Sequence, residues 1–309
     1  VISHLYRAIG GGKPGLLTKI GLHTFVDPRT ALDPRYVGGA VSQRALDARR
    51  AGGFQWVEHE RFRGEDWLFY PRFPIHCALI RATAADTRGN LSAHEEAFHH
   101  ELLAIAQAAH NSGGIVIAQV RELVEHHQSL ADIRVPGLLV DHVVVCEDPA
   151  EHQMTFGEAF NPAYVTAWRG ARFTPESAAV DDAPTTPRKE GSGQATAVEA
   201  RLIVQRRAVL ELARRNPRVV NLGVGMPAAV GDLAHRAGLH GFTLTVEAGP
   251  VGGIPADGLS FGASAYPEAV VDQPAQFDFY EGGGIDLAIL GLAELDGAGH
   301  VNVSKFGTG

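Results

Sequence analysis

Short apolar runs rich in β-branched residues, separated by segments of helical composition, restrict the fold of this chain more than any other feature. Such runs lie at 74–80, 114–120 and 138–146. A helix is predicted over 94–110, and the Asn-Ser-Gly-Gly sequence of 111–114 ends it. Short continuous apolar runs are typical of strands buried on both faces of a sheet. The alternation therefore predicts an α/β fold with open, mostly parallel sheets packed between helices.

A second αβ pattern follows a stretch with the composition of a linker. Residues 173–194 hold three prolines and the sequence Arg-Lys-Glu-Gly-Ser-Gly. We therefore predict domains at 1–170 and 197–309, joined by a linker at 171–196. After the linker, helices are predicted at 197–215 and 227–237, and strands at 219–222, 242–246 and 285–290.

Composition excludes several classes of protein. The net charge of −8 and the lack of a long Lys/Arg run argue against a nucleic-acid surface. A hydrophobic share of 45% is too high for a disordered chain. No apolar run has membrane-spanning length, and no signal peptide is visible. Cys77 and Cys146 both lie in apolar runs, which predicts two buried, reduced thiols. These features predict a soluble cytoplasmic protein.

The strongest candidate for chemistry lies in the segment 243–255. A hydrophobic strand leads directly to Glu247, and Gly249, Gly252 and Gly253 follow closely. Charged side chains at the carboxyl ends of strands line the usual ligand crevice of open α/β folds. Small neighbours let a substrate approach the carboxylate, which can act as a nucleophile toward an activated acyl group. Spacing alone also allows a solvated glutamate at a strand end.

The sequence Gly223-Val-Gly-Met-Pro-Ala228 supports a competing interpretation. It lies between a predicted strand and a predicted helix, and it matches a relaxed dinucleotide-binding fingerprint that includes Gly225. Glu247 follows about 20 residues later, where an acid that binds ribose is expected. The second half would then be the NAD(P)-binding domain of an oxidoreductase. The dense Gly/Pro loop after Glu247 argues against this alternative.

Other clusters carry weaker signals. Gly283 and Gly284 end a run of three glycines before a predicted buried strand, which indicates backbone packed against a ligand or another chain, or simply a turn. The sequence Gly10-Gly-Gly-Lys13 lacks the Gly-Lys-Ser/Thr end of a nucleotide P-loop. The His-His pairs at 99–100 and 126–127 lack metal-ligand spacing, so no metal site is predicted.

Eight blocks of sequence, taken together and in order, resemble one enzyme family. Three of them read Gly-Gly-Ile-Val-Ile-Ala-Gln-Val, Thr-Val-Glu-Ala-Gly and Phe-Asp-Phe-Tyr-Glu-Gly-Gly-Gly. The chain resembles the acetate/3-ketoacid and propionate CoA-transferases, which are glutamate-dependent family I enzymes, over nearly its whole length. The blocks are 21–29, 67–70, 74–76, 81–90, 113–120, 245–249, 277–284 and 301–307.

The resemblance implies two linked αβ halves, equivalent to the α and β subunits of heteromeric relatives, with the active site between them. It implies that Glu247, in its Glu-x-Gly context, is the catalytic residue. It also implies that Gln119 is a strand-end glutamine facing that glutamate. The family pattern continues past the end of this sequence into a Gly-rich block, so we expect a fragment that lacks both ends and has an incomplete oxyanion hole. The Arg-rich region 38–60 departs from the family.

The reaction implied by the resemblance moves CoA between a short-chain acyl-CoA and a carboxylic or 3-keto acid, by a ping-pong mechanism through a glutamyl-CoA thioester. Coenzyme A is then a substrate, and no metal, flavin or nicotinamide cofactor is required. The resemblance implies partners limited to acyl-CoA and carboxylic acid substrates, a homo-oligomer, and a role in ketone-body or short-chain fatty acid metabolism. A non-catalytic αβ module that binds a sugar phosphate or an effector is the second alternative.

Overall fold

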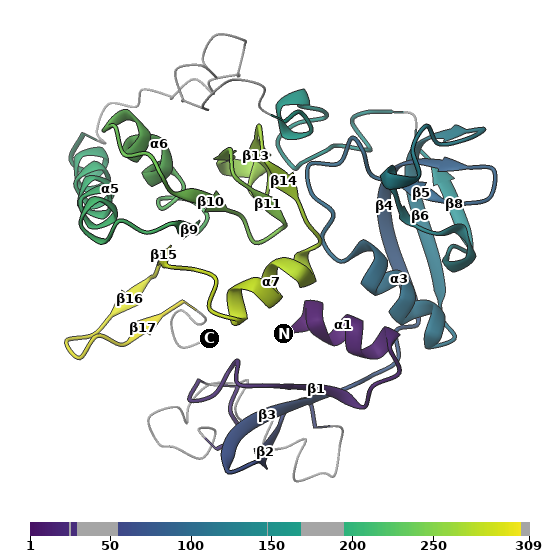
Figure 1. Cartoon of the computed structure of the whole chain (residues 1–309), viewed down its shortest axis with the longest axis horizontal. Helices are drawn as coiled ribbons and strands as arrows, with labels where there is room; N and C mark the ends of the chain where they lie inside the picture. Colours follow the sequence, from purple (N-terminus) through teal and green to yellow (C-terminus); the bar gives the residue numbers. More distant parts are fainter. Residues whose placement is uncertain (25, 30–54, 147, 168–194, 304–309) are drawn as a thin grey trace. The chain divides into compact units, whose positions relative to one another are not determined.

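The computed structural model describes residues 1–24, 26–29, 55–146, 148–167 and 195–303, and its contacts divide the chain into two compact units (Figure 1). Unit 1 comprises Val1–Ser92 and Glu101–Val145, and unit 2 comprises Ala93–His100 and Cys146–Phe306. The predicted linker lies almost wholly outside the described residues, so the domain limits stay a prediction. No described helix is long and apolar enough to cross a membrane.

Unit 1 is built around a five-stranded sheet. Its strand order is β7-β5-β4-β6-β8, where β4 pairs in parallel with β6, β6 in parallel with β8, and the other two pairs are antiparallel. A separate antiparallel sheet has the order β1-β3-β2. The strands of unit 1 are β1 (Gly15–Thr18), β2 (Glu58–Phe62), β3 (Glu65–Pro71), β4 (Cys77–Asp86), β5 (Leu91–Ser92), β6 (Ile115–Val124), β7 (Ile133–Val135) and β8 (His142–Val145).

Two helices cover one face of the larger sheet. Helix α3 (Leu102–Asn111) packs against β4 and β6, and helix α1 (Ile2–Gly10) packs against α3. Buried and accessible residues alternate along most of β6, so the prediction of a strand buried on both faces is wrong. On the other face, Leu79 is 75% exposed and Ile115 is 43% exposed. Period-two alternation is the pattern of a strand covered on one side.

Unit 2 contains a second five-stranded sheet with the same pattern of pairing. Its order is β14-β11-β10-β9-β15, with β10 and β15 parallel to β9 and the two remaining pairs antiparallel. Two small antiparallel pairs, β12–β13 and β16–β17, complete the strands. They are β9 (Val219–Leu222), β10 (Thr243–Thr245), β11 (Pro250–Val251), β12 (Ile254–Pro255), β13 (Ser264–Ala265), β14 (Ala269–Val270), β15 (Leu287–Ile289), β16 (Glu294–Leu295) and β17 (Val301–Asn302).

Helices lie against both faces of this second sheet. Leu222 of β9 and Leu244 of β10 join a core with α5 (Ala195–Arg215) and α6 (Ala229–Arg236). Neighbouring residues of a strand point to opposite faces. Asn221, between two core residues of β9, therefore faces the other side, where it contacts Tyr280 of α7 (Gln273–Glu281). This arrangement places α7 beside the end of β10.

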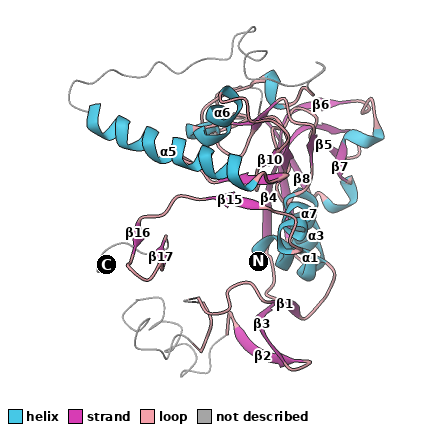
Figure 2. Cartoon of the chain, turned by 60° about the vertical axis from the view of Figure 1, so that its left-hand side comes forward, coloured by secondary structure: helices cyan, strands magenta, loops and turns pink. Residues whose placement is uncertain are grey.

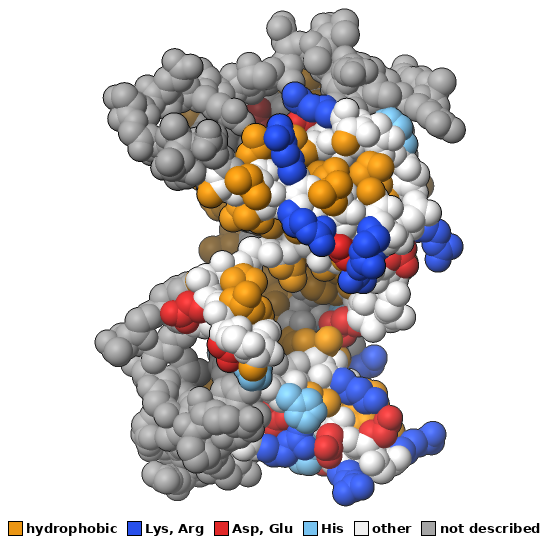
Figure 3. Space-filling view, turned by 90° about the vertical axis from the view of Figure 1, so that its left-hand side faces the viewer, with side chains coloured by type: hydrophobic (Ala, Val, Ile, Leu, Met, Phe, Trp, Pro, Cys, Tyr) orange, Lys and Arg blue, Asp and Glu red, His pale blue; other side chains and the backbone are white. Residues whose placement is uncertain are grey.

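The longest helix of unit 2 is α5, with 21 residues (Figure 2). It ends at Arg215, as predicted, and its exposed side includes Ile203, Val204 and Leu210. On the face of unit 2 that carries α5, hydrophobic side chains lie among those of arginines (Figure 3). Part of the positive charge of this helix is neutralised locally, because the Glu211 carboxylate accepts hydrogen bonds from three arginines, Arg207, Arg214 and Arg215.

Several other predictions need correction. Helix α3 begins only at Leu102, because His100 has a left-handed backbone (φ 47°) that interrupts a right-handed helix. Ala97 instead packs in a cluster of unit 2. The run 138–146 is a strand only from His142, after a short 3₁₀ turn. The two cysteines are free thiols, but Cys77 is exposed and Cys146 is half-buried, because Cys77 lies on the uncovered sheet face.

Candidate functional site

Glu247 lies in the tight turn of the hairpin that joins β10 to β11. The backbone N–H of Gly249 donates to the carbonyl of Val246 (3.0 Å), and the N–H of Val246 donates to the carbonyl of Pro250 (2.9 Å). These two bonds close the turn and place Glu247 at its first central position. The residue is exposed and directly follows the carboxyl end of a strand that is parallel to β9. This is the position where open α/β sheets bind ligands.

No described residue forms a hydrogen bond or an ion pair with the Glu247 carboxylate. A buried or structural carboxylate normally accepts hydrogen bonds from neighbouring amides or cations. The Glu247 side chain therefore has no visible role in holding the hairpin together. Its carboxylate is exposed, and the nucleophilic role predicted from the sequence stays a prediction.

The glycines around Glu247 are needed by the backbone itself. Gly249 has φ 125°, and a Cβ atom there would collide with the carbonyl oxygen of Val271. Gly252 and Gly253 also have positive φ, and their Cβ positions lie against Glu268 and against backbone oxygens of β13 and its neighbour. A positive φ strains any residue with a side chain. Protein atoms thus already require glycine at these three positions, and their predicted contact with a substrate stays a prediction.

The triple glycine ends helix α7. Gly282 is the residue after the helix, and Gly283 has φ 91°, as is usual for glycine at a helix C-terminus. A Cβ atom on Gly284 would collide with the ring of Phe279. Of the interpretations open from the sequence, the structure shows a turn packed against its own helix. The strand that follows, β15, is only partly covered.

A buried polar network lies on the α7 side of β9 and β10. The Asn221 side-chain amide donates to the carbonyl of Thr245 (3.2 Å) and to the hydroxyl of Tyr280 (3.3 Å). Gln276 also donates to the Tyr280 hydroxyl, at 2.8 Å. Burial raises the pKa of Tyr280 above its usual value, hydrogen bonds from Thr245, Gln276 and Asn221 oppose that rise, and the negative charge of Glu247 adds to it. The network therefore lies within electrostatic reach of Glu247.

Sequence reasoning assigned no role to Asn221, Gln276 or Tyr280. One signal was present, because Asn221 is a polar residue inside an otherwise aliphatic strand, Val-Val-Asn-Leu. Such a residue must find a hydrogen-bond partner when the strand is buried. Its partner Tyr280 is 59 positions away in the chain, and no local pattern gives that contact.

Gln119 lies in unit 1, on β6. Its backbone is in register with Arg81 of β4 and Val144 of β8, on the sheet face that α3 does not cover. Gln119 is half-buried. Because Gln119 and Glu247 belong to different units, the predicted approach of Gln119 to the catalytic glutamate stays a prediction.

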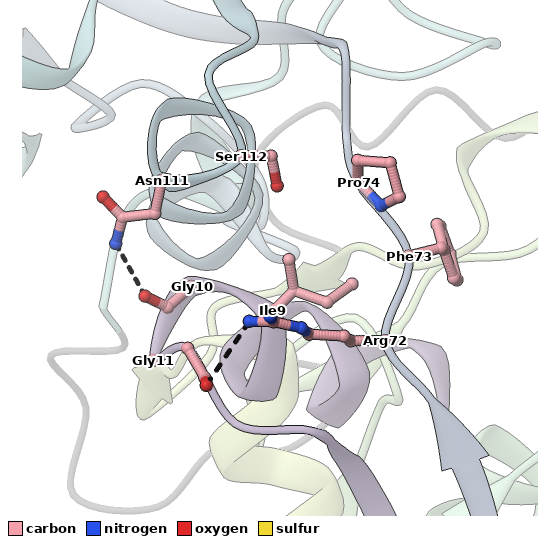
Figure 4. A pocket seen from close by; sticks show the side chains of 9 residues that line it. Ile9, Gly10, Gly11, Arg72, Phe73, Pro74, Asn111 and Ser112 are labelled. Carbon is pink, nitrogen blue, oxygen red and sulfur yellow. Dashed lines mark hydrogen bonds between the residues drawn. The ribbon is translucent and has the colours of Figure 1, made fainter.

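A pocket of about 550 Å³ in unit 1 lies beside the glycine-rich loop that follows α1 (Figure 4). The side-chain amide of Asn111 donates to the carbonyl of Gly10 (2.6 Å), and Arg72 donates to the carbonyl of Gly12 (3.4 Å). Both α1 and α3 end here, so the carbonyl ends of two helices converge on the pocket. A phosphate binds helix N-termini instead, which supports the sequence argument against a P-loop.

In the described part of the chain, no group of three or more His, Cys, Asp or Glu side chains is placed to hold a metal ion. His99 and His152 are both buried in unit 2. His152 lies 3.5 Å from the carboxylate of Glu96, and His99 lies 3.9 Å from that of Asp272. Each histidine thus lies beside a carboxylate of unit 2.

Comparisons with known proteins agree on one family. A family model described as coenzyme A transferase matches residues 3–146. The caffeate CoA-transferase of Acetobacterium woodii is 41% identical over 308 residues, which cover 99% of this chain and 52% of that protein. Along nearly its whole length, the chain is similar to coenzyme A transferases. A second family member, the acetate CoA-transferase YdiF of Escherichia coli O157:H7, is 35% identical over 311 residues, which cover 99% of this chain and 51% of that protein.

Solved structures of the same E. coli family member share the fold. The apoenzyme matches with a TM-score of 0.74 at 33% identity, over 99% of this chain and 51% of that chain. A thioester complex with CoA matches with a TM-score of 0.75 at 32% identity, over the same shares. The predicted family and the α/β fold are thus confirmed. The chain spans about half the length of the curated relatives it matches.

The similarity to CoA-transferases, which extends over the second half of the chain, argues against the competing prediction of an NAD(P)-binding half, which rested on Gly223, Gly225 and Glu247. The strand–helix–strand unit predicted there does exist, as β9, α6 and β10. After β10, however, the chain turns back directly into an antiparallel strand. The dense loop that argued against nucleotide binding is this hairpin.

Proposed function

We propose that this chain supplies the catalytic glutamate of a CoA-transferase, and that Glu247 becomes a covalent thioester with CoA. The observation that carries the proposal is the exposed carboxylate of Glu247, held at the tip of a hairpin and free of hydrogen bonds from the described residues. Two relatives that match nearly the whole chain are named CoA-transferases. One solved relative is a thioester complex with CoA, which supports the same chemistry here.

In the first half-reaction, the Glu247 carboxylate attacks the thioester carbonyl of RCO-CoA. The C–S bond breaks, CoA leaves as the thiolate, and a mixed anhydride of Glu247 and the acyl group remains. The thiolate then attacks the glutamyl carbonyl. The carboxylate RCOO⁻ leaves, and glutamyl-CoA is formed.

The second half-reaction runs in reverse with the acceptor acid. R′COO⁻ attacks the glutamyl thioester and displaces the CoA thiolate, giving a second anhydride. The thiolate attacks the R′ acyl carbonyl, which releases R′CO-CoA and the free carboxylate of Glu247. Water never receives the acyl group, so the site must exclude it. Amide donors must also stabilise each oxyanion, and Gln119 is our proposed contributor from unit 1.

The covalent intermediate is directly testable on the purified natural protein. Because the mechanism is ping-pong, incubation with acyl-CoA alone should add CoA to Glu247 before any acceptor acid is present. Borohydride should then reduce the thioester and inactivate the enzyme, whereas borohydride without acyl-CoA should have no effect. Peptide mapping by mass spectrometry should place the change on the peptide that holds Glu247.

Glu247→Ala should abolish both labelling and transfer, and should leave the melting temperature unchanged because the side chain holds nothing in the hairpin. The matched control is Glu294→Ala, which removes another exposed carboxylate of unit 2, one that accepts a hydrogen bond from Asn302. The control should keep normal labelling. Near-normal transfer by Glu247→Ala, or labelling on another residue, would contradict the proposal.

The finer properties stay proposals from the sequence. These are a short-chain acyl-CoA and a carboxylic or 3-keto acid as substrates, the equivalence of the two halves to α and β subunits, a homo-oligomer and a cytoplasmic location. Competition between acyl-CoA substrates of different chain length, measured as kcat/KM, tests the first of these.

A further inference from the structure

Three exposed apolar side chains lie together on two loops of unit 2. Phe156 is 78% exposed, Leu259 is 65% exposed and Phe261 is 43% exposed. The ring centroids of Phe156 and Phe261 are 6.4 Å apart. The two loops also meet at Gly157, where a Cβ atom would lie 3.2 Å from the Cβ atom of Leu259. The three side chains therefore form one apolar patch, and a gathered patch marks a binding surface more often than scattered apolar residues do.

A buried polar network fixes the two loops that carry the apolar patch. The hydroxyl oxygens of Thr155 and Ser260 are 2.9 Å apart, and both residues are buried. The Glu158 carboxylate accepts hydrogen bonds from the Ser260 hydroxyl (2.8 Å) and from the Tyr164 hydroxyl (2.6 Å). Thr155 and Ser260 are chain neighbours of the patch residues. Polar groups lie inside and phenyl rings outside, which reverses the usual distribution and gives a preformed apolar surface.

The loop that carries Phe261 contacts the turn that carries the candidate nucleophile. A Cβ atom on Gly262 would lie 3.6 Å from the Cβ atom of Ala248. Ala248 directly follows Glu247, and Gly262 directly follows Phe261. Because consecutive Cα atoms are about 3.8 Å apart, this contact limits the distance between the Cα atoms of Glu247 and Phe261 to about 14 Å. A thioester that reacts at Glu247 therefore brings its acyl group to the neighbourhood of the patch.

We propose that Phe156, Leu259 and Phe261 form the subsite for the acyl group, and that this subsite favours apolar acyl groups that extend several carbons beyond the thioester carbonyl. This inference rests on the proposed function of Glu247. The two phenylalanine rings suit an acyl group that itself ends in an aromatic ring, because aromatic rings pack favourably against one another. An acetyl group has a single methyl beyond its carbonyl and gains little from such a surface. The subsite thus extends the substrate class beyond the short chains expected from the sequence resemblance.

The test compares two substrates of the natural protein, acetyl-CoA and 3-phenylpropanoyl-CoA. The measured quantity is the selectivity ratio, defined as kcat/KM for 3-phenylpropanoyl-CoA divided by kcat/KM for acetyl-CoA. Any effect of a variant on Glu247 itself cancels in this ratio. In Phe261→Ala, we expect the selectivity ratio to fall by about 10- to 100-fold, because only the longer acyl group loses a contact. Phe156→Ala should shift it in the same direction. Both side chains are exposed, so the melting temperature should change little.

A matched pair of leucines separates an acyl subsite from the general effect of losing an exposed apolar side chain. Leu259 is 65% exposed, and Leu210 of α5 is 63% exposed. Leu259→Ala should lower the selectivity ratio by about 3- to 10-fold, whereas Leu210→Ala should leave it unchanged. Equal ratios in these two variants would contradict the subsite. A loss of kcat/KM that is the same for both substrates in Phe261→Ala would also contradict it.

A second copy of the chain is the alternative occupant of the apolar patch. If Phe156→Ala dissociates the protein in sedimentation velocity and keeps the selectivity ratio, the patch is an interface and the acyl subsite is wrong. The subsite is also wrong if the natural protein does not accept 3-phenylpropanoyl-CoA. In both cases acetyl-CoA should still label Glu247, and the proposed function stands. If Glu247→Ala still forms the thioester, the proposed function itself is wrong.

Discussion

The hairpin after β4 in unit 1 and the hairpin after β10 in unit 2 have turns with the same backbone hydrogen bonds. Each turn carries one carboxylate, but at a different position. In unit 1, Gly89 N–H donates to the carbonyl of Asp86, and Asp86 N–H donates to the carbonyl of Asn90. In unit 2, the same two bonds join Val246 with Gly249 and Pro250. Each turn has a glycine with positive φ in the same position. Each also follows a central strand with a parallel neighbour on one side.

The carboxylate at the first position of the unit 1 turn is fully engaged by its own loop. One oxygen of Asp86 accepts from the backbone N–H groups of Arg88 and Asn90, and the other accepts from the side chain of Asn90. Burial works to raise the pKa of Asp86, but the bonds from Asn90 and Arg88 outweigh it and lower the pKa. Asp86 is therefore a structural residue.

In unit 2 the carboxylate is one position further along. Val246 occupies the place of Asp86, and Glu247 occupies the place of the exposed Thr87. Pro250 also replaces Asn90, and a proline has no N–H to donate. The turn thus offers the carboxylate fewer donors and points it away from them. One position along the turn thus decides whether a strand-end acid accepts hydrogen bonds from its own turn, as Asp86 does, or accepts none from the described residues, as Glu247 does.

The largest effect on transfer activity is expected when the carboxylate of the unit 2 turn is moved by one position, from residue 247 to residue 246. In the double variant Val246→Asp with Glu247→Thr, the acid takes the position of Asp86, where the backbone N–H of Ala248 is the counterpart of the Arg88 donor. We expect transfer activity to fall by at least ~10⁴-fold, as for loss of the nucleophile. Steady-state transfer assays should show the double variant to be as inactive as Glu247→Thr alone. Appreciable activity in the double variant would mean that the position of the acid in the turn does not matter.

A smaller effect is expected on stability, when Gly249 of the unit 2 turn and Gly89 of the unit 1 turn are each replaced by alanine. In Gly249→Ala, the new Cβ atom would collide with the carbonyl oxygen of Val271. The backbone must move to relieve this collision, so we expect the free energy of unfolding to fall by about 3 kcal/mol. In Gly89→Ala the new Cβ atom meets only an ordinary contact, 3.6 Å from Gly137 Cα. Strain from positive φ alone should then cost about 1 kcal/mol. Denaturant unfolding of both variants measures the difference, and equal losses would contradict it.

Gly249 has two possible roles that a larger substitution separates. The small residue was predicted to let a substrate approach Glu247, and in that role Gly249→Val would damage activity more than stability. The collision with Val271 instead favours a direct loss of stability. A thermal melt recorded beside the transfer assay on Gly249→Val distinguishes the two roles.

The smallest effect concerns the contribution of Asp86 to the free energy of unfolding, and how this contribution depends on pH. Because the pKa of Asp86 is lowered in the folded state, its contribution is present above the unfolded pKa of about 3.9. It is lost as the pH falls through the lower, folded value. We expect Asp86→Ala to cost about 1 kcal/mol at pH 7 and less near pH 3. Unfolding curves at both pH values test this, and a pH-independent difference would show that the carboxylate charge is not involved.

Local patterns in the sequence predicted the helices and strands whose limits depend on neighbouring residues. β9 matches its predicted range of 219–222, and α5 ends at the predicted Arg215. Glu247 was identified from the strand that leads to it and from the family resemblance. The rest depends on distant contacts. The helix predicted from residue 94 begins late because Ala97 packs with Met154 and other distant residues. Helix α7 was missed because its sequence was considered only as the approach to three glycines.

The sheet face of unit 1 opposite α3 is exposed at the start of β4, and this part of it also provides a site for chemical labelling. Cys77 lies on this face of β4, in register with Ile115, and its thiol is exposed. Cys146 is half-buried, with its sulfur 3.7 Å from a carboxylate oxygen of Glu151. A short treatment with a maleimide dye should therefore label Cys77 first. The fluorescence of that single dye would report when another surface comes to rest on the sheet, without any change to Glu247 or its neighbours.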